Sequence, residues 1–150
     1  MAEIEIYTDG ACAATTGSGG WAAYLIHKPT GYTKMISGGK QQTTNNEMEL
    51  MAPIEALKAL KRNSTVIVYS DSQYVVNGIM QWSHKWKKAG WKKKGGEIKN
   101  LELWKGLYKL AHESGHKVRF AWVKGHNGNE YNELVDKEAN RISQLGKAQP

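Results

Sequence analysis

TTNNEMELMAPIEALKALKRNS, residues 43–64, has the composition of a single long helix. Thr44, Asn45 and Asn46 are residue types that cap a helix start, and Asn63-Ser64 is expected to end it. Between these ends, Ala, Leu, Lys, Met and Glu dominate, and these residues have high helix propensity. One face of the helix is charged and the other is apolar, so the helix is expected to pack on a larger core.

Two acidic residues of this helix, Glu47 and Glu49, lie on different faces. At about 100° per residue, Glu47 lies with the lysines and arginine of the solvated face, whereas Glu49 lies opposite, beside Ala56 and Leu57. An ionised carboxylate is almost never fully buried without a partner. Glu49 is therefore expected to have another charge, a metal ion or a raised pKa, and Glu47 is expected to be a surface acid.

The length of 150 residues predicts one domain, residues 1–150, with a short polar tail at 146–150. No apolar run approaches the roughly 18 residues of a membrane span, and no signal peptide precedes the first strand. The single cysteine, Cys12, excludes an internal disulfide and fits a reducing compartment. We expect a cytoplasmic protein, a monomer with no membrane contact and no obligate protein partner.

The formal net charge of +7 favours an anionic partner, and nucleic acid first of all. Between Trp82 and Lys99 the chain carries seven lysines against one acid, Glu97, with tryptophans interleaved. Such a segment is either a solvated face or a basic protrusion that contacts phosphates. The clustering favours a protrusion, which would bind without reading bases.

The order of expected elements indicates an α/β fold with a mixed sheet flanked by helices. Residues 83–97 show no clean periodicity. The expected strands are 3–9, 20–28, 32–40, 64–71 and 116–125, and the expected helices are 43–64, 72–82, 100–114 and 129–146.

Three further acids lie at or near the ends of these elements. Asp9 closes the first strand, Asp71 closes the fourth, and Asp136 borders the apolar stripe Tyr131, Leu134, Val135, Ala139 and Ile142 of the last helix. Alone, they could be a turn former, an N-cap and a surface acid. Together with Glu49 they would repel unless divalent cations lay between them, and oxygen ligands favour Mg²⁺ or Mn²⁺. A pair of such ions is a known device for cleaving phosphodiesters.

Several motifs, in order and spacing, resemble those of the type 1 ribonuclease H family from about Glu3 to Gln144. They are YTDGAC, TTNNEMELM, SDSQYV, WKKAGWKKK and WVKGHNGNEYNELVDKEA. The resemblance implies a ribonuclease H-like fold, in which a five-stranded mixed sheet has three antiparallel strands first and parallel strands after them. It also implies sequence-independent hydrolysis of the RNA strand of RNA–DNA hybrids, which leaves 3′-hydroxyl and 5′-phosphate ends.

The resemblance assigns roles to individual residues. It implies that Asp9, Glu49, Asp71 and Asp136 hold two Mg²⁺ ions, which Mn²⁺ could replace, and that His126 shuttles a proton, although a plain surface histidine is the alternative reading. The predicted substrate-binding residues line the hybrid's groove, form a phosphate pocket or belong to the protrusion. They are Cys12, Thr44, Asn45, Asn46, Gln73, Asn77, Trp82, Lys85, Trp86, Lys87, Lys88, Trp91 and Asn100.

Three other hypotheses compete with this one. The chain could bind hybrids without cutting them, but a pure binder would have no use for four acids facing a polyanion. It could be a DNA-cutting nuclease or transposase-like enzyme on the same fold, which TTNNEMELM and the lysine segment disfavour. It could also be a domain of a larger polymerase polyprotein, and the start at Met1 and the tail GKAQP favour a free-standing protein instead.

Overall fold

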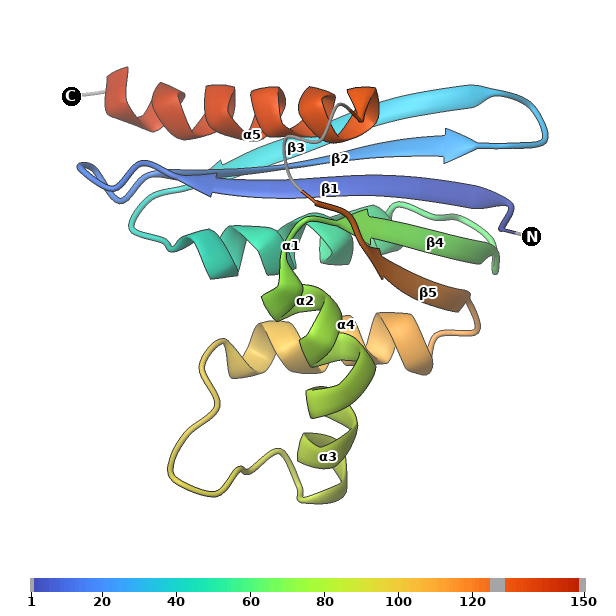
Figure 1. The fold of residues 1–150 in the computed structure, drawn as a ribbon, viewed down its shortest axis with the longest axis vertical. Coiled ribbons are helices and arrows are strands. Elements are labelled where there is room, and N and C mark those ends of the chain that lie inside the picture. Colours follow the sequence, from blue (N-terminus) through green and yellow to red (C-terminus); the bar gives the residue numbers. More distant parts are fainter. Residues whose placement is uncertain (1, 125–128, 149–150) are drawn as a thin grey trace.

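The structure is a computed structural model that describes residues 2–124 and 129–148. A five-stranded sheet with strand order β3-β2-β1-β4-β5 forms its centre (Figure 1), and this confirms the predicted fold class. The strands are β1 (Ile4–Cys12), β2 (Gly19–His27), β3 (Tyr32–Lys40), β4 (Thr65–Ser70) and β5 (Lys117–Trp122). The helices are α1 (Asn45–Lys58), α2 (Gln73–Asn77), the π-helix η1 (Gly78–Trp82), α3 (Ser83–Lys88), α4 (Leu101–His112) and α5 (Glu130–Ala148).

The strand directions follow the expected mixed pattern. β1 pairs antiparallel with β2, and β2 pairs antiparallel with β3. β4 runs parallel to β1, and β5 runs parallel to β4. The carboxyl ends of β1, β4 and β5 therefore lie at the same edge of the sheet, which is where open α/β sheets bind ligands.

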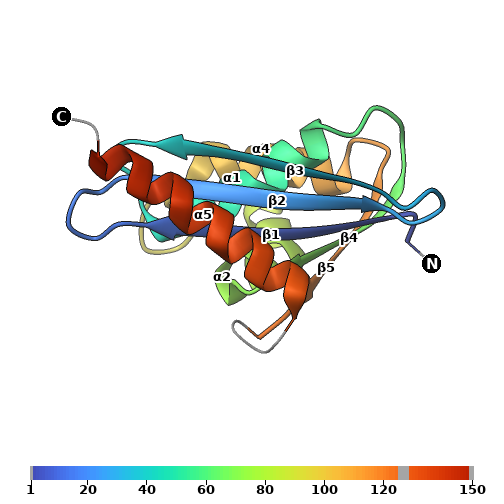
Figure 2. The same cartoon turned by 90° about the horizontal axis from the view of Figure 1, so that it is seen from above.

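Helices cover both faces of the sheet. α5 crosses one face, and α1 and α4 lie on the other (Figures 1 and 2). The larger core lies between the sheet and the helices α1 and α4, and it includes Ile6, Leu50, Val68 and Trp104. A smaller core with Val135 and Ala139 fills the space under α5. None of the helices that the structure describes is long and apolar enough to cross a membrane.

Helix α1 begins as predicted but ends earlier. The hydroxyl of Thr44 caps its first turn by accepting a hydrogen bond from the Glu47 amide at 3.1 Å. The prediction that it runs to Asn63-Ser64 is wrong, because the helix ends at Lys58. Its last turn tightens through bonds such as Leu60 N–H to Leu57 carbonyl at 3.2 Å, a common way to satisfy terminal carbonyls.

Two further departures concern helices. Residues 83–88, expected to be irregular, form α3, which continues directly from η1. The π-turn of η1 inserts a residue into the helical period, so a regular repeat does not run through both segments. In α5, Leu134 is 40% exposed and lies outside the apolar stripe, whereas Val135 and Ala139 are buried.

Candidate active site

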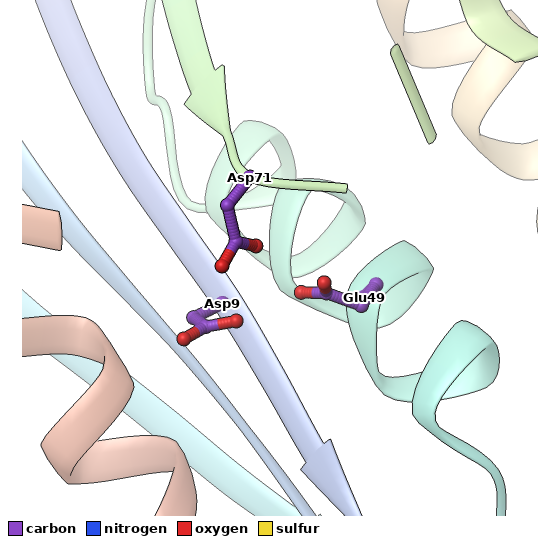
Figure 3. Close-up of side chains that lie close together, drawn as sticks. All are labelled: Asp9, Glu49 and Asp71. Carbon is purple, nitrogen blue, oxygen red and sulfur yellow. The ribbon is translucent and has the colours of Figure 1, made fainter. Parts of the chain in front are cut away.

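Three carboxylates from three elements meet at the carboxyl edge of the sheet. Asp9 belongs to β1, Asp71 follows the last residue of β4, and Glu49 belongs to α1. Each offers a carboxylate oxygen, and these oxygens all lie within 4.8 Å of one another. Figure 3 shows the three side chains pointing toward a common space. Glu49 therefore lies against other acids, whereas Glu47 forms an ion pair with Lys40.

Gly10 allows α1 to approach β1 closely enough for this arrangement. A Cβ atom at Gly10 would lie 2.5 Å from the backbone nitrogen of Glu49 and 2.5 Å from the carbonyl carbon of Met48. Real Cβ atoms essentially never come so close, so any larger residue would displace the helix that carries Glu49. Gly10 was not among the predicted site residues, and the only sequence signal for it is its place directly after Asp9.

The cluster is unfavourable for negative charge. Asp9 is only 4% exposed, and its burial, followed by the nearby Asp71 carboxylate, raises its pKa to about 8. Burial raises the pKa of Glu49 well above its ordinary value, and the charges of Asp9 and Asp71 raise it further. These shifts are those expected for carboxylates that share a site without a cation.

A divalent cation fits this site. Among the residues that the structure describes, Glu49 Oε1 and Asp71 Oδ1 are buried and have no hydrogen-bond partner. Buried charged oxygens without partners are costly, and a hard cation bound by oxygen ligands would satisfy them and offset the repulsion. Within the described ranges, the clustered donors are all carboxylate oxygens, which suit Mg²⁺ or Mn²⁺ better than zinc.

A groove with a volume of about 810 Å³ lies between the start of α1 and the lysine-rich segment 82–99, called the protrusion below, which contains α3. Six of the predicted substrate-binding residues line it, and four residues that were not predicted join them. The predicted ones are Thr44, Asn46, Trp82, Lys85, Trp86 and Asn100, and the others are Tyr74, Lys93, Ile98 and Lys99.

The comparisons with known proteins agree with this geometry. A sequence model of the RNase H family matches residues 1–144. The chain belongs to the ribonuclease H family. It is 50% identical to the Ribonuclease H of Acidovorax sp. (strain JS42) over 142 residues, which cover 94% of this chain and 95% of that protein. It is 51% identical to the Ribonuclease H of Acetivibrio thermocellus over 141 residues, covering 93% of each.

Solved structures of the family share the fold. The crystal structure of LC9-RNase H1, a type 1 RNase H with the type 2 active-site motif, matches with a TM-score of 0.82 at 30% identity. That match covers 97% of this chain and 73% of the other. The solution structure of the PFV RNase H domain matches with a TM-score of 0.81 at 25% identity, covering 97% of this chain and 96% of the other. The chain is therefore a ribonuclease H, a member of a family of nucleases.

The family resemblance also named Asp136 and His126. Asp136 lies outside the group of three, but its side chain is close enough to Asp9 to raise the pKa of that carboxyl. Its Oδ1 and its backbone carbonyl accept hydrogen bonds from the side-chain nitrogen Nδ2 of Asn140, at 3.2 and 2.8 Å respectively. His126 lies outside the described residues, so its role stays a prediction.

The other predicted substrate-binding residues do not line the groove, and their roles stay predictions. Lys87 forms an ion pair with Glu113 and lies 5.1 Å from the centre of the Tyr108 ring. The centre of the Trp91 ring lies 5.6 Å from the centre of the same tyrosine ring. The Cys12 thiol donates a hydrogen bond to the Thr43 carbonyl at 3.3 Å. Asn45, Gln73, Asn77 and Lys88 are exposed.

Proposed function

We propose that this ribonuclease H hydrolyses the RNA strand of RNA–DNA hybrids with little sequence preference and leaves 3′-hydroxyl and 5′-phosphate ends. The observation that carries the proposal is the carboxylate cluster of Asp9, Glu49 and Asp71. It lies at the carboxyl edge of the sheet in a chain of the matching family. The cluster has the composition of a divalent-metal site, and the basic groove suits a polyanion.

Asp9, Glu49 and Asp71 would hold Mg²⁺, with Asp136 as a fourth ligand and Mn²⁺ as a substitute. A pair of bound divalent cations supplies an activated water and stabilises the leaving oxygen in phosphodiester hydrolysis. The protein contributes buried carboxylate oxygens that are free to bind a cation. Among the described residues, Glu49 Oε1 and Asp71 Oδ1 make no competing hydrogen bond. His126, which lies outside that part, would carry a proton to or from the reacting groups.

The groove would hold the hybrid through its backbone. Lys85, Lys93 and Lys99 line it and are exposed, so they can contact phosphates, and Trp82 offers an aromatic surface. Such contacts carry no base information. Cys12, Asn45, Asn46 and Gln73, which have polar side chains near the start of α1 and α2, would distinguish RNA from DNA by contacting 2′-hydroxyl groups.

We also propose that the protein acts as a monomer and that the chain forms a single domain. All three clustered carboxylates come from one chain, and the family match extends over residues 1–144. Sedimentation of the protein with and without hybrid tests this directly. A dimer that is needed for cleavage would contradict it.

The function is tested with an end-labelled RNA–DNA hybrid in Mg²⁺, beside double-stranded RNA, double-stranded DNA and single-stranded RNA. We expect cutting of the hybrid's RNA strand alone. Product ends are read by treating the fragments with phosphatase and polynucleotide kinase, and the proposal requires a 5′-phosphate on each downstream fragment. Tight hybrid binding without cleavage in Mg²⁺ or Mn²⁺ would instead identify a binding protein.

A further inference from the structure

We propose that Trp122 is a positioning residue, whose indole N–H holds the backbone of Asp71 so that the Asp71 carboxylate can bind a divalent cation. The inference rests on the proposed function, because it assigns Asp71 a place in the metal site. It goes beyond that function by naming a residue that lies outside the carboxylate cluster.

Strand β5 brings Trp122 beside the end of β4. In the parallel ladder, Trp122 is the register partner of Ser70, the last residue of β4. The amide of Val123 donates to the Ser70 carbonyl at 2.9 Å, which completes the pairing of the two strands. The indole nitrogen Nε1 of Trp122 then donates to the carbonyl of the next residue, Asp71, at 3.1 Å.

This bond reaches Asp71 just where the strand ladder no longer does. Asp71 is the first residue after β4 and lies in a bend before α2. On its other side, the Ser72 amide donates to the Ser70 hydroxyl, which closes the bend. The indole N–H therefore adds one hydrogen bond between β5 and this segment beyond the end of the ladder, and that bond is made to Asp71 itself.

Asp71 needs such a hold because its side chain is repelled by its neighbours. Its carboxylate lies within 4.8 Å of those of Asp9 and Glu49, and like charges at such distances push the groups apart. Within the described part of the chain, Asp71 Oδ1 has no hydrogen-bond partner that could keep it in place. The position of this oxygen therefore depends on how the Asp71 backbone is held.

The exposure of Trp122 argues against a simple packing role. Its side chain is 45% exposed, which is unusual for an aromatic residue that serves only to fill a core. It is also absent from the described hydrophobic clusters. Replacing the ring should therefore disturb the core little, and the N–H bond is the contact that the replacement removes.

The test compares three variants by Mn²⁺ binding to the substrate-free protein, measured by electron paramagnetic resonance of the free ion at pH 8. Trp122→Phe keeps a ring but removes the donor. Trp122→His keeps a donor, because imidazole Nε2 corresponds in position to indole Nε1. Tyr32→Phe, an exposed aromatic on β3, is the matched control.

We expect Trp122→Phe to weaken Mn²⁺ binding about tenfold, in the range measured for groups that orient metal ligands. Trp122→His should recover most of the affinity, and Tyr32→Phe should bind as the wild type does. The melting temperature in EDTA should stay close to that of the wild type in all three. Wild-type affinity in Trp122→Phe would overturn the inference, and so would a loss that Trp122→His does not restore or that a lower melting temperature accompanies.

The experiments distinguish a failure of this inference from a failure of the proposed function. If the wild type binds Mn²⁺ but does not cut hybrids, the function fails while the variant series still tests Trp122. If the wild type cuts hybrids and Trp122→Phe binds Mn²⁺ equally well, only the role of Trp122 fails.

Discussion

At the scale of single residues, Gly10 decides how closely the helix of Glu49 lies to the strand of Asp9. In Gly10→Ala the new methyl group would meet the backbone of Met48 and Glu49, so α1 must shift. We expect a loss of about 1–3 kcal/mol in the free energy of unfolding, as overpacking usually causes, and a large fall in hybrid cleavage. Denaturant unfolding and initial cleavage rates measure the two effects.

Gly106→Ala is the matched control for that substitution. Gly106 lies inside α4, and no atom of the described residues lies within 4 Å of a Cβ built on it. Since alanine favours a helix interior over glycine by roughly 0.5–1 kcal/mol, this variant should be slightly more stable and equally active. A stable, active Gly10→Ala protein would show that α1 does not need the close approach.

The raised pKa of Asp9 predicts how stability changes with pH in the absence of metal. An acid whose pKa is higher in the folded state binds its proton more tightly there, so its contribution is complete below the unfolded pKa of 3.8 and is lost as the pH rises toward about 8. Urea unfolding in EDTA should therefore show stability falling across this window. Asp9→Asn should flatten the profile and be roughly 1–2 kcal/mol more stable at pH 8, although inactive. An unchanged slope in Asp9→Asn would contradict the assignment.

The residues of the cluster differ in how far the sequence predicts them. The helical period separates Glu49 from Glu47, and the end of β4 singles out Asp71, because both patterns are local. The prediction that Asp9 closes the first strand is wrong, because β1 continues to Cys12; Asp9 instead follows Thr8, where the pairing of β1 with β4 ends. Gly10 and Trp122 could not be found in this way. Their roles depend on contacts with Met48 and Asp71, which the fold alone brings near them.

At the scale of elements, the protrusion and α1 form the groove, and its lysines should set affinity more than rate. Replacing Lys85, Lys93 and Lys99 with glutamine should weaken hybrid binding, with kcat nearly unchanged. The salt slope should fall by about one for each phosphate that a lysine no longer neutralises. Fluorescence anisotropy at several salt concentrations in Ca²⁺ or EDTA gives the slope.

Lys34→Gln combined with Lys61→Gln is the control for the groove lysines. Both residues are exposed and lie outside the groove, on β3 and after α1, so these substitutions remove positive charge without altering the groove. If this variant binds hybrid as weakly, per charge removed, as the groove variant does, overall charge accounts for binding and the groove does not.

The elements that the sequence predicts least well are those governed by tertiary contacts. The π-turn η1 is one: the Ile79 carbonyl accepts bonds from the Ser83 hydroxyl at 3.0 Å and from His112 Nε2 at 3.1 Å. His112 belongs to α4, far along the chain, so no local pattern indicates this bond. By contrast, the cap at Thr44 is visible in the sequence because it is made within one turn.

At the scale of the whole molecule, cation binding should stabilise the fold, because the cluster draws on β1, α1 and the end of β4 together. A ligand that binds only the folded state adds about 2.7 kcal/mol at a concentration of 100 Kd. We expect Mg²⁺ to raise the melting temperature of the wild type and to have little effect on Asp71→Asn. An equal rise in both proteins would place the bound ion elsewhere.

The order of strands and helices predicts the α/β class and the mixed sheet correctly, but it does not predict the strand order β3-β2-β1-β4-β5. What the order leaves open is whether acids far apart in the sequence converge. The structure brings Asp9, Glu49 and Asp71 together and leaves Asp136 beside them, with its Oδ1 bonded to Asn140.

The most direct test of the carboxylate cluster uses two neighbouring glutamates of α1. Initial rates of hybrid cleavage in Mg²⁺ are measured for the wild type, Glu49→Gln and Glu47→Gln, with EDTA as the blank. Glu49 belongs to the cluster, whereas Glu47 pairs with Lys40. We expect Glu49→Gln to fall to the EDTA level and Glu47→Gln to keep a rate near that of the wild type. Full activity in Glu49→Gln would contradict the assignment of this cluster as the catalytic metal site.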